Sequence, residues 1–145
     1  MNMKKIVSLS LLLLTTILLT TQCGCRKSCD QKIDGNWQVV NMNGEAIEPV
    51  HDQLTLNIEA KKKIAGGIGI CNRFSCNLDT KEIKEGKIKF GEIVSTKVGC
   101  DKISYEFALF SCLEMATNYS LSGDVLVLTG DGPEGKSSIT FIRKK

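Results

Sequence analysis

The feature that most constrains the fold of this chain is a series of short runs in which apolar and polar residues alternate. A period of two is typical of β-strands that are buried on one side only. The runs span residues 36–40, 53–59, 64–70, 87–93, 118–121, 125–129 and 138–142. Turn signals such as Asn43-Gly44 and Asp131-Gly132 separate them. We therefore expect about seven strands, in the antiparallel order that short connections favour.

A single stretch, residues 103–116, has the spacing of an amphipathic helix. Asp101 or Lys102 lies at its start, and Asp101 is the better N-cap. The predicted apolar face contains Ile103, Phe107, Leu109, Phe110, Leu113 and Met115. The predicted polar side contains Ser104, Glu106, Ser111 and Glu114.

One helix cannot cover both faces of such a sheet. The expected fold is therefore mainly β with one helix (α+β), a strongly curled antiparallel sheet or open β-barrel of about seven strands closed by the single α-helix. Trp37 is expected in the core rather than lining a cavity. The whole expected core is Trp37, Leu54, Leu56, Ile58, Ile68, Ile88, Phe90, Phe107, Phe110, Leu126, Leu128, Ile139 and Phe141.

The N-terminus has the order of an export signal. Lys4 and Lys5 precede a mostly apolar run over residues 6–19, and polar residues follow. The run is too short for a comfortable transmembrane helix, so residues 1–22 are predicted to be a lipoprotein-type signal peptide. Residues 23–34 would form a polar tether, and residues 35–145 the domain.

The charge of the chain excludes a nucleic-acid partner. Lys4 and Lys5 are two of 19 basic residues, so the chain without its leader carries 17 basic residues against 16 acidic ones. A nucleic-acid groove needs a larger and clustered basic excess. We expect a monomer whose membrane contact is an N-terminal lipid.

Two cysteines are candidates for that lipid. Cys23 lies closer behind the apolar run but follows Gln22, where a lipobox usually has a small residue. Cys25 follows Gly24, although Gln22 then stands where an apolar residue is expected. Cleavage without lipid attachment is the third possibility. Parity favours Cys23, because its acylation leaves six of the seven cysteines, an even number that disulfides in an oxidising compartment can pair.

The residues of the domain resemble a known family. Four features are similar to the META domain, the HslJ-like family of bacterial envelope proteins and lipoproteins: Gly35-Asn36-Trp37, the segment from Ile64 to Ser75, the segment from Ser95 to Cys100, and Glu106 with an apolar helix. The resemblance covers residues 35–143. The family motif residues are Gly35, Trp37, Cys71, Asn72, Phe74, Thr96, Cys100 and Glu106.

The resemblance also suggests a disulfide pattern. The family pattern itself contains Cys71 and Cys100, so these form the first expected disulfide. This sequence departs from the family pattern at two positions. It has Ile70 where the family usually has Gly, and Cys76 where the motif usually ends in Gly. Because Cys112 is also extra to the family motifs, Cys76–Cys112 is the second expected disulfide. Cys25–Cys29 would close only a small loop in the tether.

No residue pattern supports catalysis, a metal or a cofactor. A cysteine nucleophile needs a base, and the single histidine, His51, lies in a polar run typical of a solvated loop. The acidic residues are dispersed, and no pair of Cys-x-x-Cys motifs is present for zinc. We therefore expect neither an enzyme nor a metal site nor a cofactor.

The resemblance implies a non-enzymatic protein of the cell envelope. We expect it to be exported and held at the outer membrane, on the periplasmic or surface side, by its N-terminal lipid. Its role would be binding or structural, in envelope maintenance or stress tolerance, with an unknown protein partner. The alternative is a carrier that holds a small apolar ligand or a lipid in a barrel cavity.

Overall fold

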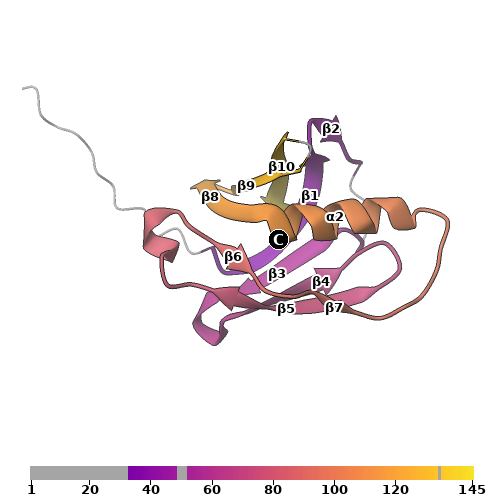
Figure 1. The fold of residues 1–145 in the computed structure, drawn as a ribbon, viewed down its shortest axis with the longest axis horizontal. Coiled ribbons are helices and arrows are strands. Elements are labelled where there is room, and N and C mark those ends of the chain that lie inside the picture. The colour runs from indigo at the N-terminus through magenta and orange to yellow at the C-terminus, as the bar shows by residue number, and fades with distance from the viewer. Residues whose placement is uncertain (1–32, 49–51, 134) are drawn as a thin grey trace, which may run out of the picture. The chain divides into compact units, whose positions relative to one another are not determined.

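The computed structural model describes residues 33–48, 52–133 and 135–145, and Figure 1 shows their arrangement. The chain divides into two units, Met1–Asp30 and Gln31–Lys145, and the first lies outside the described residues. The elements are β1 Gly35–Met42, β2 Glu45–Ala46, β3 Thr55–Glu59, the 3-10 turn η1 Ala60–Lys62, β4 Ile64–Ile68, β5 Arg73–Asp79, the 3-10 turn η2 Ile83–Glu85, β6 Lys89–Phe90, β7 Val94–Ser95, α2 Ile103–Met115, β8 Ala116–Ser122, β9 Val125–Gly132 and β10 Gly135–Arg143.

The strands form one antiparallel sheet that curls almost into a barrel. Its order is β6-β5-β4-β3-β1-β10-β9-β8, with β2 beside β1 and β7 beside β5. The two ends of this order meet again. The Ile88 N–H donates to the Thr117 carbonyl (3.1 Å), and the Tyr119 N–H donates to the Gly86 carbonyl (2.8 Å). This seam confirms the predicted fold class, with ten strands in the described residues where about seven were expected.

The missed strand of greatest consequence is β5. Its side chains alternate between exposed and buried along its whole length. Phe74, Cys76 and Leu78 point into the core, and Arg73, Ser75 and Asn77 point outward. The segment begins within the cysteine-containing motif, and its alternation is as regular as that of the predicted strands.

Side chains fill the interior of the curled sheet. Trp37, Leu56, Leu126, Leu128 and Phe141 are each 0% exposed, so most of the predicted core is confirmed. The core also includes Ile33 (5% exposed), whose carbonyl accepts a 2.9 Å hydrogen bond from Trp37 Nε1. Packed residues therefore begin two positions before the predicted boundary at residue 35. The buried apolar residues of the described ranges form one cluster within Gln31–Lys145, so this unit has a core of its own, as a domain does.

Helix α2 packs against β9, β10, β6 and β1, and it lies across the front of the strands in Figure 1. Three expectations about it are wrong. The N-cap is Lys102 rather than Asp101, and no side chain caps the helix. Phe107, assigned to the core, is 59% exposed, whereas Glu106, assigned to the polar side, is 1% exposed.

Candidate functional site

Five of the predicted motif residues meet at one place. Cys71 and Asn72 lie in the turn between β4 and β5, Thr96 follows β7, and Cys100 lies in the loop before α2. Glu106 lies in the first turn of α2. These residues come from three separate parts of the chain, and the closed sheet brings them together under the N-terminal end of the helix.

The Glu106 carboxylate is the centre of this cluster. Its Oε2 accepts hydrogen bonds from three successive backbone N–H groups, those of Ile70 (3.0 Å), Cys71 (3.0 Å) and Asn72 (2.9 Å). Successive N–H groups that converge in this way form a nest, a concave site for an anion. Gly69 makes room for the carboxylate, because a Cβ at this position would collide with Glu106 Oε2.

The Asn72 side chain extends the cluster to the loop before the helix. Its Nδ2 donates to Glu106 Oε1 (2.6 Å) and to the Val98 carbonyl (2.9 Å). Its Oδ1 accepts from Thr96 Oγ1 (2.8 Å) and from the Val98 N–H (2.7 Å). Thr96 Oγ1 in turn accepts from the Arg73 N–H (3.2 Å). The Asn72 amide therefore satisfies both backbone groups of Val98 as well as the buried acid.

A disulfide joins the same two segments covalently. Cys71 is bonded to Cys100, 29 residues further along the chain, so the first disulfide expected from the family pattern is confirmed. The bond links the β4–β5 turn, which supplies the nest, to the loop over residues 96–102. Closing a loop of this length contributes about 3 kcal/mol of stability in the chain-entropy model.

The electrostatics of the cluster favour the charged form of the acid. Burial by itself raises the pKa of Glu106, but the hydrogen bonds from the Asn72 side chain and from the N–H groups of Cys71, Asn72 and Ile70 lower it, and the net result is a pKa below the usual value. The carboxylate is thus held as a fully paired anion.

The other motif residues build the core. Trp37 is buried, and the Arg143 guanidinium lies 4.1 Å from the centre of its ring. Arg143 Nη1 also donates to the Asp34 carbonyl (2.9 Å), beside Gly35. Phe74 meets Phe110 of α2 edge to face, with ring centres 5.1 Å apart. These contacts fasten the helix and the start of β1 to the sheet.

The second expected disulfide, Cys76–Cys112, is wrong. Both cysteines are buried free thiols. Cys76 lies on β5 opposite Ala65 of β4, and burial raises the pKa of its thiol to about 11. Cys112 faces the turn after β1, with its Sγ 3.9 Å from Asn43 Oδ1. Neither thiol is bonded to another cysteine, so this pair does not link the sheet to the helix.

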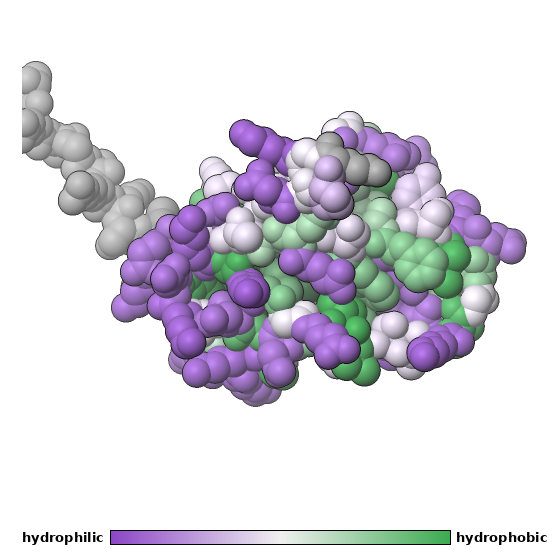
Figure 2. Space-filling view, in the orientation of Figure 1, coloured by the Kyte–Doolittle hydropathy of each residue, from purple (hydrophilic) through white to green (hydrophobic). Residues whose placement is uncertain are grey.

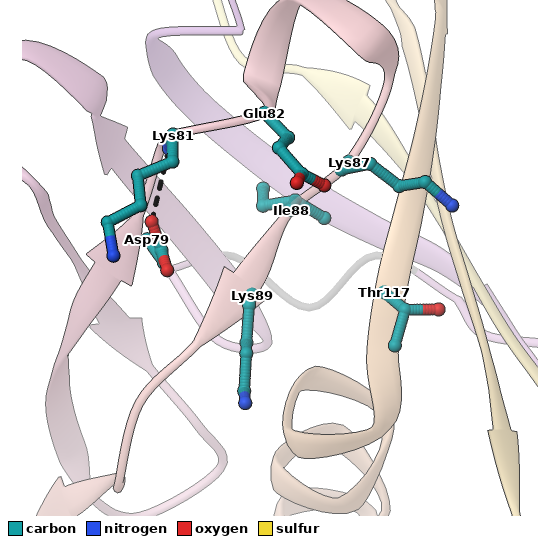
Figure 3. A pocket seen from close by; sticks show the side chains of 7 residues that line it. All are labelled: Asp79, Lys81, Glu82, Lys87, Ile88, Lys89 and Thr117. Carbon is teal, nitrogen blue, oxygen red and sulfur yellow. Dashed lines mark hydrogen bonds between the residues drawn. The ribbon is translucent and has the colours of Figure 1, made fainter.

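Open hollows lie along the surface of the described residues. One of 330 Å³ at the seam between β6 and β8 is lined by Asp79, Lys81, Glu82, Lys87, Ile88, Lys89 and Thr117 (Figure 3). Its lysine side chains point in different directions (Figure 3), and Lys87 Nζ donates to Asn118 Oδ1 (2.8 Å). The cationic groups therefore do not converge on one ligand position.

Several predicted residues lie outside the described residues, namely Cys23, Cys25, Cys29 and His51. The described ranges contain no helix with the length and apolar content that crossing a bilayer requires. Within the same ranges, no three His, Cys, Asp or Glu side chains are close enough together to hold a metal ion.

One family model and two solved structures are similar to this chain. The family model described as the META domain matches residues 30–145. A DUF4847 family protein from Bacteroides vulgatus is similar in structure, with a TM-score of 0.55 and 19% identity over 77% of this chain and 94% of its own. A protein from Burkholderia xenovorans, solved by NMR, has a TM-score of 0.54 and 21% identity over 77% of this chain and 83% of its own. These two likenesses concern the fold alone. None of the curated proteins compared with the chain matches it.

Proposed function

Because this chain belongs to the META domain family, we propose that it is a non-enzymatic, exported domain with a binding or structural role in the bacterial cell envelope, in envelope maintenance or stress tolerance. The leader over residues 1–22 supports export. Cys23, or alternatively Cys25, would carry the lipid that holds the protein at the outer membrane.

The observation that carries this proposal is the state of the motif residues. The Glu106 carboxylate, the Asn72 amide and the Thr96 hydroxyl bind one another and nearby backbone groups, and Cys71 and Cys100 are joined in a disulfide. A nucleophile needs a free lone pair and an adjacent base. In this cluster the polar groups hold the fold together, which favours a scaffold role over catalysis.

The carrier alternative requires an apolar space inside the barrel. In the described part of the chain, Trp37, Leu126 and Phe141 fill that space and are each 0% exposed. No observation favours the carrier over a binding or structural role, so the proposal does not include it.

Intact-mass analysis of the protein purified from its own membranes tests the anchor. The expected mass is that of a chain beginning at Cys23 with a diacylglycerol on its thiol. Cys23→Ser should abolish the lipid adduct, whereas the matched Cys25→Ser should keep it. The reverse result would move the anchor to Cys25. An unmodified N-terminus beyond residue 25 would contradict the anchored form of the proposal.

A further inference from the structure

Two apolar side chains are exposed beside the N-terminal half of α2. Phe107 is 59% exposed and Val98 is 55% exposed. Val94 of β7 is also exposed, at 66%, and most other large apolar side chains in the described ranges are buried. Figure 2 shows apolar side chains gathered on the face over which α2 lies. This surface does not contribute to the core, so it needs another explanation.

Phe107 lies on the flank of α2 that also carries Ile103 and Phe110. Phe110 contacts Phe74 of β5, and Phe107 lies one turn before Phe110 along the same flank. Cys112, on the opposite flank, faces Asn43 instead. Val98 lies close to the first turn of α2, because the Asn72 Nδ2 that donates to the Val98 carbonyl also donates to Glu106 Oε1. We call Val98, Ile103, Phe107 and Phe110 the apolar flank.

The loop that carries Val98 is held in place from below. Asn72 binds both the N–H and the carbonyl of Val98, and the disulfide fixes Cys100 two residues later. With its backbone fixed in this way, the Val98 side chain is presented outward without having to be ordered when a partner arrives. Such preorganisation reduces the entropy lost on binding.

Basic residues surround the apolar flank. Lys97 and Lys102 are exposed on either side of Val98 in the loop, where Asp101 is the one acidic residue. Glu106, the acid nearest to Phe107 in the chain, is buried and its charge is satisfied by the nest. Glu114 is exposed two turns further along the helix. The edge of the apolar flank nearest the loop is therefore basic.

We infer that the apolar flank docks on an anionic phospholipid bilayer, with Phe107 and Val98 inserted at the interface and Lys97 and Lys102 beside the headgroups. Aromatic and aliphatic side chains next to lysines suit a surface that is apolar inside and negatively charged outside. The inference rests on the proposed function, which puts the domain beside a membrane. It adds an orientation, because the helix end of the barrel would face the lipid.

Co-sedimentation with vesicles tests the inference without the N-terminal lipid. The unit of residues 31–145 is mixed with vesicles of phosphatidylcholine alone or of phosphatidylcholine with phosphatidylglycerol. We expect binding to the anionic vesicles that weakens with added salt. Phe107→Ser should lower the affinity roughly tenfold, since it removes one large apolar group from the interface. Lys97→Glu should lower the affinity for anionic vesicles only.

The matched control is Val125→Ser. It removes an apolar side chain that is 40% exposed on strand β9, outside the apolar flank. It should bind vesicles like the unmodified domain. Circular dichroism verifies that each variant is folded. Absence of binding to anionic vesicles, or equal losses for Phe107→Ser and Val125→Ser, would overturn the inference. Neither result affects the proposed anchor, which the intact mass of the full-length protein decides separately.

Discussion

The two flanks of helix α2 reverse the usual distribution of polar and apolar residues. Glu106 is acidic and 1% exposed, while its neighbour Phe107 is aromatic and 59% exposed. The first faces three backbone N–H groups in the β4–β5 turn that have no strand partner, and a carboxylate satisfies all three. The second faces away from the core. A helix at the open side of a barrel borders the core, a polar turn and solvent. Its side chains therefore cannot be divided simply into one apolar face and one polar face.

The largest expected effect comes from removing the buried acid. Glu106→Ala should lower the free energy of unfolding by about 3–5 kcal/mol, because it leaves buried donors without an acceptor. Urea denaturation measures the loss. The matched variant Glu114→Ala removes an exposed acid from the same helix and should change the stability by less than about 0.5 kcal/mol. Equal effects of the two substitutions would show that the nest does not stabilise the fold.

Loss of the disulfide should have the next largest effect. Cys71→Ser with Cys100→Ser should lower the free energy of unfolding by about 3 kcal/mol, since the bond closes a loop between residues separated by 29 positions. Thermal denaturation with and without a reductant measures this. The reductant should lower the Tm of the unmodified protein and leave the Tm of the double variant unchanged. A reductant-sensitive double variant would mean that a different disulfide contributes.

A glycine pair tests the space around the nest. Gly69→Ala places a methyl group against the Glu106 carboxylate and should cost about 1–3 kcal/mol of stability through overpacking. At Gly99 an added Cβ meets no atom within 4 Å, so Gly99→Ala should cost less than about 0.5 kcal/mol. Urea midpoints of the two variants decide between a crowded nest and a loosely packed one.

A smaller contribution should appear as an acid dependence. The pKa of Glu106 is lower in the folded protein than its ordinary value, so the unfolded state binds more protons in that range and stability rises with pH there. The stabilisation is complete above the unfolded pKa and is lost as the pH falls through the folded pKa. Urea midpoints measured from neutral to acidic pH should therefore fall less steeply for Glu106→Gln. An identical pH profile for both proteins would contradict the pairing of the charge.

The smallest effect on stability is expected on the other flank. Phe107→Ser should change the free energy of unfolding by less than about 0.5 kcal/mol, because the side chain is mostly exposed. Urea denaturation of Phe107→Ser and of Glu106→Ala compares the free energies of unfolding that the two flanks contribute. A loss of several kcal/mol would show that Phe107 belongs to the core, as its helical spacing predicted.

Local patterns were sufficient for much of the fold. Alternation around Trp37, Leu56 and Leu126 predicted buried strands, and the three side chains are each 0% exposed. The same rule applies to Phe74, Cys76 and Leu78, so β5 was predictable from the residues alone. Its beginning overlaps the cysteine-containing motif.

The cluster around Glu106 was only half predictable. The resemblance to the family predicted the Cys71–Cys100 bond, but it did not predict that Asn72, Thr96 and Glu106 bind one another. The hydrogen bonds to Glu106 span 34–36 positions of sequence. No local period reports contacts over such a separation. The unpaired N–H groups that make a buried acid favourable exist only once the β4–β5 turn has formed.

The sequence by itself determined the class of this protein, a curled antiparallel sheet with one helix, and through its motifs the family and the Cys71–Cys100 bond. Alternation and helical spacing are properties of neighbouring residues. They can therefore be recognised in the sequence without knowing which distant segments pack together. Only the tertiary structure decided that Glu106 is buried, that Phe107 is exposed and that Cys76 and Cys112 remain apart. These outcomes depend on how the closing of the sheet rotates α2 against the strands, and segments far apart in the chain set that rotation.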